Sequence, residues 1–293
     1  MIKKDSYCKK ILWIWLASIA IPFPLNATET AIDRGRYLAN AAGCLTCHTD
    51  SERNGIPFAG GREIDTPFGV FIVPNITPDE MTGIGKWNDS DFIAAVLEGR
   101  SPSGEYYYPS FPYPSYAGMQ EQDVLDIKSY LDSMPASNNK MKGHKLKWYI
   151  PGRWAMKIWQ SIYSPWEFSP LPAEANALMR RGAYLVRNLG HCSECHTPRN
   201  RLGILLTDQE LEGGSKQSEF SNAPNITNDK RNGIGEWTAM DLEFFLDLGM
   251  LPDGDFTGSD MAAVIDNSTS QLTAEDREAM VVFLRSVSTK PEE

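Results

Sequence analysis

Two five-residue motifs with the pattern Cys-x-x-Cys-His constrain this chain more than any other feature of its sequence. They occupy residues 44–48 and 192–196. Two cysteines three residues apart on one helical turn reach the two vinyl groups of one porphyrin and form thioethers, and the next histidine then lies under the iron. The sequence therefore predicts two covalently bound haem c groups. The predicted attachment residues are Cys44, Cys47, Cys192 and Cys195, and the predicted iron ligands are His48 and His196.

A bare Cys-x-x-Cys pair also occurs in redox dithiols and in zinc sites. A thioredoxin-like dithiol needs a βαβ context, and no strand-rich pattern surrounds either pair. A four-cysteine zinc site needs pairs that lie closer in sequence than these, which are 148 residues apart. Neither alternative requires a histidine directly after the second cysteine in both copies, so haem attachment is favoured.

The first residues have the pattern of a secretory signal peptide, which we place at 1–27. Four lysines precede an apolar run from Ile11 to Ile21, which is too short to span a bilayer. An uncleaved N-terminal anchor is the alternative. Cleavage removes Cys8 and leaves every remaining cysteine in a haem motif. We therefore expect a periplasmic protein, soluble or on the periplasmic face of the cell membrane, and peripheral membrane association stays open.

The charge of the chain bears on its partners rather than on its fold. The formal net charge is −10, and loss of 1–27 removes four lysines with a single aspartate, so the exported chain is more acidic still. This argues against nucleic acid as a partner and favours a protein with a basic docking face, because charge mainly sets encounter rates.

The chain repeats itself at an offset of about 150 residues, and the repeat suggests the domain organisation. Arg-Gly-x-Tyr-Leu occurs at 34–38 and 181–185, Pro-Asn-Ile-Thr at 74–77 and 224–227, and Gly-Ile-Gly-x-Trp at 83–87 and 233–237. We predict an all-α fold of two tandem cytochrome c-like domains with long haem-wrapping loops, at 28–137 and 173–293. The segment between them, 138–172, is rich in Lys and carries four tryptophans, so we expect it to pack across both domains.

Each repeat is expected to contain three helices. The first spans about 31–42 and 173–190, and the second spans about 89–98 and 239–248. An apolar stripe predicts a third helix in each repeat, and Thr273 has the features of an N-cap for the last one. Gly35 and Gly182 favour a close crossing between the first and last helices, although simple tolerance of glycine is the alternative.

Further shared motifs identify a family that the chain resembles. They comprise Ala-Gly-Gly at 59–61, Thr-Pro-Phe-Gly at 66–69, Pro-Asn-Ile-Thr-Pro-Asp at 74–79, Tyr-Pro-x-Phe-Pro-Tyr at 108–113, Cys-His-Thr-Pro-Arg-Asn at 195–200 and Met-Ala-x-Val at 261–264. The chain resembles the cytochrome c subunits of bacterial membrane-associated alcohol, aldehyde and gluconate dehydrogenases. The resemblance implies electron transfer from a dehydrogenase. Those subunits usually carry three haem domains and reduce quinone, whereas this chain carries two motifs, so we expect a two-haem relay.

The sixth iron ligands follow partly from this resemblance. Met261 lies where the family places its ligand in the second domain, and Met250 is a weaker candidate. In the first domain many relatives have Met where this chain has Phe111, which cannot bind iron. Met119 is the replacement that we predict there, and without it the first haem would be five-coordinate.

Several other side chains have two interpretations. Trp87 and Trp237 either donate to a haem propionate or wall the pocket, and Arg199 either pairs with a propionate or is a surface arginine. His191 abuts Cys192 and is expected to point away from the iron. His144 is expected to be solvated.

The sequence thus favours an electron-transfer protein or a dehydrogenase subunit over an enzyme acting by itself. We expect electrons to arrive from an exported dehydrogenase and to leave for an oxidase, quinone or soluble carrier. The alternative is a two-haem enzyme, of the peroxidase or thiosulfate-oxidising type, that uses an open first haem.

Overall fold

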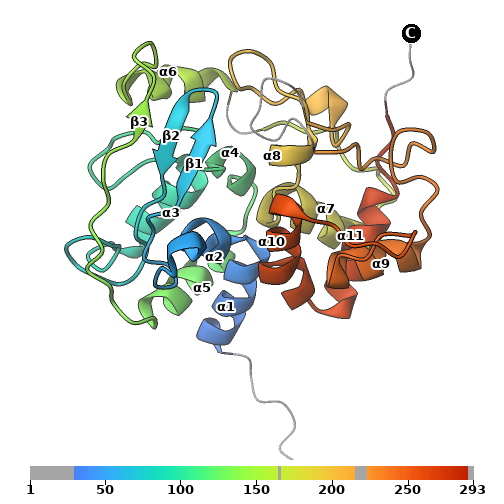
Figure 1. The fold of residues 1–293 in the computed structure, drawn as a ribbon, viewed down its shortest axis with the longest axis horizontal. Coiled ribbons are helices and arrows are strands. Elements are labelled where there is room, and N and C mark those ends of the chain that lie inside the picture. Colours follow the sequence, from blue (N-terminus) through green and yellow to red (C-terminus); the bar gives the residue numbers. More distant parts are fainter. Residues whose placement is uncertain (1–29, 164–165, 215–222, 290–293) are drawn as a thin grey trace, which may run out of the picture.

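The computed structural model describes residues 30–163, 166–214 and 223–289, which are mainly helical (Figure 1). The predicted signal peptide at 1–27 lies outside these ranges. Within them, no helix is both long and apolar enough to cross a membrane. The main helices of the N-terminal repeat are α1 (Ala31–Ala41), α2 (Cys44–Cys47), α3 (Asp89–Glu98), α4 (Tyr113–Tyr116) and α5 (Glu121–Asp132). Those that follow are α6 (Trp154–Tyr163), α7 (Ala177–Tyr184), α8 (Ser193–His196), α9 (Ala239–Leu248), α10 (Ser259–Asn267) and α11 (Ala274–Leu284).

The second helix of each repeat begins and ends where the sequence predicts. Asn88 caps α3 by accepting from the backbone N–H of Asp91, whose carboxylate accepts from the backbone of Asn88 in return. Thr238 and Asp241 form the same reciprocal pair at the start of α9. Such a capping box satisfies two backbone donors that the helix itself leaves unpaired, so it fixes the first residue.

The first and last helices of each repeat cross at a glycine. A Cβ atom on Gly35 would lie 1.8 Å from the carbonyl oxygen of Asp126 in α5. A Cβ atom on Gly182 of α7 would lie 1.9 Å from the carbonyl oxygen of Ala279 in α11. Both glycines are therefore required by close helix approach, which confirms the expected crossing. The first helix of the C-terminal repeat is shorter than predicted, because α7 gives way to one π-helical turn, η2 (Leu185–Leu189).

A small antiparallel sheet departs from the all-α prediction. Strands β1 (Glu63–Thr66), β2 (Gly69–Ile72) and β3 (Lys145–Leu146) pair in the order β1-β2-β3, with Thr66 opposite Gly69 and Gly69 opposite Leu146. The strands are too short to show a clear alternation in the sequence, and β3 is supplied by a distant segment. Thr66 Oγ1 donates to the carbonyl of Gly69 at 2.7 Å and accepts from the N–H of Phe68, which fixes the turn.

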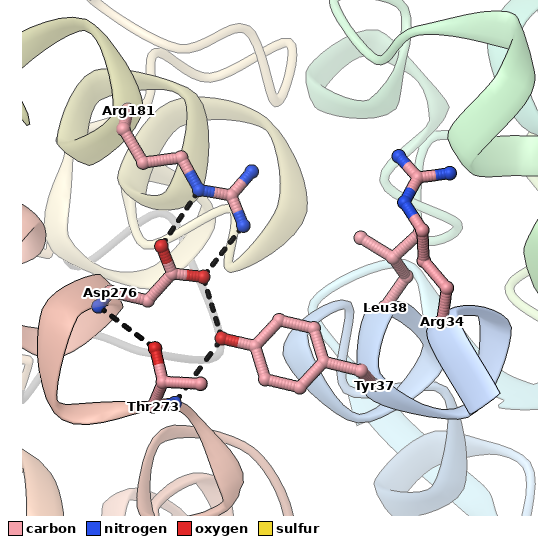
Figure 2. A pocket seen from close by; sticks show the side chains of 6 residues that line it. All are labelled: Arg34, Tyr37, Leu38, Arg181, Thr273 and Asp276. Atoms are coloured by element: carbon pink, nitrogen blue, oxygen red, sulfur yellow. Dashed lines mark hydrogen bonds and ion pairs between the residues drawn. The ribbon is translucent and has the colours of Figure 1, made fainter. Parts of the chain in front are cut away.

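The two repeats meet through reciprocal contacts. The hydroxyl of Tyr37 in α1 donates to Asp276 of α11 at 2.5 Å, and that of Tyr184 in α7 donates to Asp123 of α5 at 2.5 Å. Figure 2 shows the first of these pairs, in which Arg181 also donates twice to Asp276. Each repeat thus contributes one tyrosine hydroxyl and one aspartate carboxylate to the contact between the repeats. The hydrophobic core is continuous across both repeats.

The tryptophans of 138–172 do not all pack as expected. Trp166 is buried and Trp159 packs edge-on against it, at 5.8 Å between ring centroids. Trp148 and Trp154 are exposed. The domain limits at 28–137 and 173–293 remain a prediction, since one core joins the two repeats.

Candidate haem sites

The first motif forms the short helix α2, and its histidine is oriented by the backbone. Gly43 precedes the helix with a left-handed φ of 64°, and the N–H of His48 donates to the carbonyl of Cys44 at 2.9 Å. His48 Nδ1 lies 2.8 Å from the carbonyl oxygen of Pro74. A carbonyl oxygen only accepts, so Nδ1 carries the proton and Nε2 keeps its lone pair for a metal.

The first motif faces a cavity of about 450 Å³ whose exposed lining is mostly apolar. Cys44, Cys47 and His48 line it together. Met119, a buried residue between α4 and α5, lines the same cavity, as does Phe111. The structure therefore brings together the two cysteines, the histidine and the methionine that the sequence proposes for this site. Trp87 also lines the cavity, which favours its interpretation as a pocket wall.

The second motif has the same local geometry. It forms α8, and His196 Nδ1 lies 2.8 Å from the carbonyl oxygen of Pro224, the counterpart of Pro74 in the repeat. The N–H of His196 donates to the carbonyl of Cys192 at 2.9 Å. Nε2 of His196 therefore keeps its lone pair for a metal, as Nε2 of His48 does.

Met261 occupies the position in the C-terminal repeat that Phe111 occupies in the first. An isolated antiparallel bridge pairs Arg100 with Tyr106, and its counterpart pairs Met250 with Phe256 at an offset of 150 residues. Counting eleven residues on from the start of each bridge gives Phe111 and Met261. Met261 is half-buried in the first turn of α10. The weaker candidate, Met250, pairs with Phe256 in that bridge at the end of α9.

Desolvation sets the protonation of the motif side chains. It lowers the pKa of His48 to about 4 and also lowers the pKa of His196, in each case against an opposing hydrogen bond to a proline carbonyl. Both imidazoles are neutral at pH 7, as metal binding requires. Burial raises the pKa of the Cys44 and Cys192 thiols to about 12, whereas a redox dithiol needs a lowered one. In the described part of the chain, no three His, Cys, Asp or Glu side chains cluster as a metal site of their own.

A buried carboxylate inside the second motif was not singled out by the sequence analysis. Glu194 accepts hydrogen bonds from Ser115 of α4 and from the indole N–H of Trp166, at 3.0 Å, and it pairs with Arg199. Burial alone would raise the pKa of Glu194, but the charge of Arg199 and these hydrogen bonds outweigh it and lower the pKa. The hydrogen bond from Ser115 thereby connects the second motif to the N-terminal repeat. Arg199 is largely buried and pairs with Glu194, so it is not a plain surface arginine, and its pairing with a propionate stays a prediction.

His144 does not lie where the sequence suggests, and His191 makes a contact that the sequence does not predict. His144 is half-buried rather than solvated, because its Nδ1 accepts the N–H of Ile72 at 3.1 Å beside the sheet. His191 is part of the C-terminal repeat, yet its ring lines the cavity of the first motif. Residue spacing cannot reveal such a contact, because it joins segments almost 150 residues apart.

These observations fit a covalently attached haem at the first motif. The cavity is apolar, both thiols border it, and the imidazole nitrogen that faces away from Pro74 is the one left for iron. For the second motif the fit rests on the matching histidine geometry.

Comparison with known proteins identifies c-type cytochromes that are similar to this chain. No protein-family model matches the chain. A diheme cytochrome c-type protein of Cereibacter sphaeroides is 40% identical over 261 residues, which cover 87% of this chain and 85% of that protein. The gluconate 2-dehydrogenase cytochrome c subunit of Pantoea cypripedii is 35% identical, covering 90% of this chain and 61% of that subunit. The fructose dehydrogenase cytochrome subunit of Gluconobacter japonicus is 36% identical, covering 92% of this chain and 55% of that subunit.

This chain therefore spans little more than half the length of those two dehydrogenase subunits and most of the diheme protein. The identity is distributed over nearly the whole of the chain and includes both repeats. From its motifs, its site geometry and these relatives, the protein belongs to the family of c-type cytochromes that includes the cytochrome subunits of gluconate, alcohol and fructose dehydrogenases.

Proposed function

We propose that this protein carries electrons from an exported dehydrogenase to a respiratory acceptor through two covalently bound haem c groups. The proposal rests first on the cavity of the first motif, where Cys44, Cys47, His48 and Met119 converge. The names of the relatives support a dehydrogenase as the donor. An oxidase, quinone or soluble carrier in the periplasm is the acceptor, and the signal peptide at 1–27 directs export.

The cofactor supplies an iron that exchanges one electron between its ferric and ferrous states. The chain supplies the ligands and their orientation. The carbonyls of Pro74 and Pro224 hold His48 and His196 in one tautomer, and the apolar wall of the first cavity limits water there. Met119 and Met261 are the proposed sixth ligands. A thioether ligand raises the reduction potential and closes the site to exogenous ligands.

The test is a pair of single substitutions, His48→Ala and His196→Ala, in the exported protein. Each variant is expected to lose the low-spin absorption of one haem and to keep that of the other, because each histidine binds its own iron. The two variants control for one another. Loss of both low-spin signals in either single variant would contradict two separately ligated haems.

The two-haem enzyme considered from the sequence needs an open position at the first iron. Met119 on the cavity wall argues against an open position. Exposure of the reduced protein to carbon monoxide decides between the two functions. An unchanged spectrum supports electron transfer alone, whereas carbon monoxide binding at one haem of the unmodified protein would favour the enzyme.

We further propose that α6 holds the protein at an anionic membrane surface. Trp154, Ile158 and Ile162 form a stripe along α6 and are 74%, 58% and 62% exposed. The opposite face packs Met156 against Phe71 and Tyr108 of the N-terminal repeat, so the stripe faces outward. Exposed tryptophan and isoleucine on one face are typical of helices that lie in the headgroup region of a bilayer.

The charge around α6 favours lipid over a basic protein partner. The segment 138–172 contains six basic residues and a single acidic one, Glu167, in a chain whose net charge is −10. Lys145 and Arg153 pair with Glu63 and Glu105, at 2.8 and 3.1 Å, and the remaining lysines of the segment complement anionic lipid headgroups. The basic residues are Lys140, Lys142, Lys145, Lys147, Arg153 and Lys157.

Sedimentation with vesicles tests this attachment. The exported protein, with its N-terminus established by mass, should bind vesicles rich in phosphatidylglycerol more strongly than vesicles of phosphatidylcholine. The double variant Trp154→Ser/Ile158→Ser should bind severalfold more weakly, while Met240→Ser/Phe244→Ser, which changes exposed apolar residues of α9, should bind normally. Equal binding by both double variants, or binding only to a purified dehydrogenase, would refute the lipid assignment.

A further inference from the structure

The residues that immediately precede the two haem motifs meet each other. Gly43 precedes Cys44 and His191 precedes Cys192. A Cβ atom on Gly43 would lie 3.9 Å from Nε2 of His191, so the imidazole ring rests against the backbone at the start of the first motif. Of the residues lining the first cavity in the described ranges, His191 alone comes from the C-terminal repeat.

The position of His191 is firmly held. Its φ of 38° is in the left-handed region, which non-glycine residues rarely adopt, so the surrounding structure maintains it. The backbone N–H groups of Gly190 and Cys192 donate to the carbonyls of Leu185 and Val186, at 2.6 and 2.9 Å. The ring packs edge-on against Tyr116, with 5.3 Å between centroids.

The His191 ring reaches the other motif through Tyr116, whose ring it contacts edge-on. The hydroxyl of Tyr116 donates to the carbonyl of Ala42, two residues before Cys44, at 2.7 Å. A route from Cys192 to Cys44 therefore runs through the backbone and imidazole of His191, the Tyr116 ring, one hydrogen bond, and the backbone of Ala42 and Gly43. Apart from the contact between the two rings and that hydrogen bond, the links on this route are covalent bonds.

Electron tunnelling falls off more slowly along covalent bonds and hydrogen bonds than across a gap, so such a route matters if both cysteines carry haem. The hydrogen bond between Glu194 of the second motif and Ser115 reaches α4 and not the first motif. The contacts of His191, by comparison, reach the residues directly before Cys44.

We propose that His191 is the bridge by which electrons pass between the two haem sites. This inference rests on the proposed function, since it requires a haem at each motif. One electron leaves the ferrous haem and enters the ferric haem, so one iron is oxidised and the other reduced. No bond breaks and no proton moves. His191 is a positioning residue here, because its ring lies against Gly43, directly before Cys44, and does not bind iron.

The experiment measures the rate of electron exchange between the haems after rapid photoreduction. The variants are His191→Leu, which removes the planar ring that contacts Tyr116, and His191→Gln, which keeps a planar polar group there. Asn188→Ala is the matched control, because Asn188 donates to the carbonyl of Ser115 at 2.9 Å across the same interface without touching either motif. Absorption spectra and redox titration of each variant first establish that both haems are attached and that their potentials are retained.

The exchange rate should fall severalfold in His191→Leu, return most of the way in His191→Gln and stay at the wild-type value in Asn188→Ala. A wild-type rate in His191→Leu with both haems attached would overturn the bridge, as would equal losses in His191→Leu and Asn188→Ala. If His191→Leu fails to load haem, a slow rate in a loaded His191→Gln would likewise overturn it. Absence of a second haem in the wild-type protein would instead overturn the proposed function, so the two failures are distinguishable.

Discussion

Phe111 and Met261 are counterparts in the two repeats, and at the scale of single residues this difference makes the two proposed haem sites unequal. Each lies eleven residues after the start of an equivalent backbone bridge. A phenyl ring cannot bind iron, and two methionines, Met119 and Met141, line the cavity of the first motif beside Phe111. Met119 is the buried one, and it is the sixth ligand that we propose for that site. The first site therefore draws its proposed ligand from a residue eight positions further along the chain.

Substitution of Met119 by leucine tests this assignment. Met119→Leu should remove the methionine–iron absorption of one haem, lower the potential of that haem and let it bind carbon monoxide, because leucine fills the space without offering a lone pair. The matched control is Met81→Leu, since Met81 is exposed in a polar turn. An unaltered spectrum in Met119→Leu would show that another group binds the first iron.

The predicted attachment cysteines and the predicted histidine ligand of each motif rest on local spacing, and they stay predictions. The surroundings of the motifs do not follow from local spacing. The contacts of Glu194 and His191 depend on partners in the other repeat, Ser115 and Tyr116, and no local pattern encodes such contacts.

At the scale of secondary-structure elements, two glycine crossings set how closely the helices approach. Gly35→Ala and Gly182→Ala should each lower the free energy of unfolding by at least about 1–3 kcal/mol, because the added methyl would overlap a backbone carbonyl that cannot move alone. Denaturant unfolding followed by circular dichroism measures the change. Gly143→Ala is the control, since no atom lies within 4 Å of its added Cβ and it should unfold as wild type does. Equal stability of all three variants would refute the close crossing.

Helices α3 and α9 were predictable to the residue, since a capping box at Asn88 and Thr238 marks where each begins. The strands were not, because two consist of four residues and the third pairs Leu146 with Gly69 over a long stretch of chain. The π-helical turn after α7 also has no simple sequence signal. Local chemistry thus predicts helix ends, whereas pairing between distant segments decides the sheet.

At the scale of the whole molecule, Tyr37 and Asp276 on one side and Tyr184 and Asp123 on the other join the two repeats. Internal sequence repetition predicted two similar halves but not this reciprocal arrangement, since tyrosine and aspartate are common surface residues whose partners cannot be read from the sequence. Burial would raise the pKa of Asp276, but hydrogen bonds from Arg181 and Tyr37 and the charge of Arg181 outweigh it and lower the pKa.

Because the pKa of Asp276 is lower in the folded state than in the unfolded chain, the free energy of unfolding decreases as the pH falls into the acid range. The contribution of Asp276 is fully present above its ordinary pKa of 3.8 and is lost as the pH falls through the lower, folded-state value. Asp276→Asn should therefore flatten the loss of stability in acid below about pH 4, measured as the midpoint of denaturant unfolding at a series of pH values. At neutral pH, Tyr37→Phe should cost about 1.5–3 kcal/mol, the value of a hydrogen bond to a charged group. An acid profile of Asp276→Asn that parallels that of the wild type would contradict this assignment.

The reciprocal tyrosine–aspartate contacts have the form of a two-fold dimer interface, in which each partner presents the same patch to the other. Two separate chains joined in this way would come apart on dilution, because their association is bimolecular. Here one polypeptide connects both halves, so the effective concentration of each half for the other is set by the connecting segment and not by the abundance of the protein. The two motifs consequently stay paired in a single copy of the molecule, and exchange between them requires no encounter.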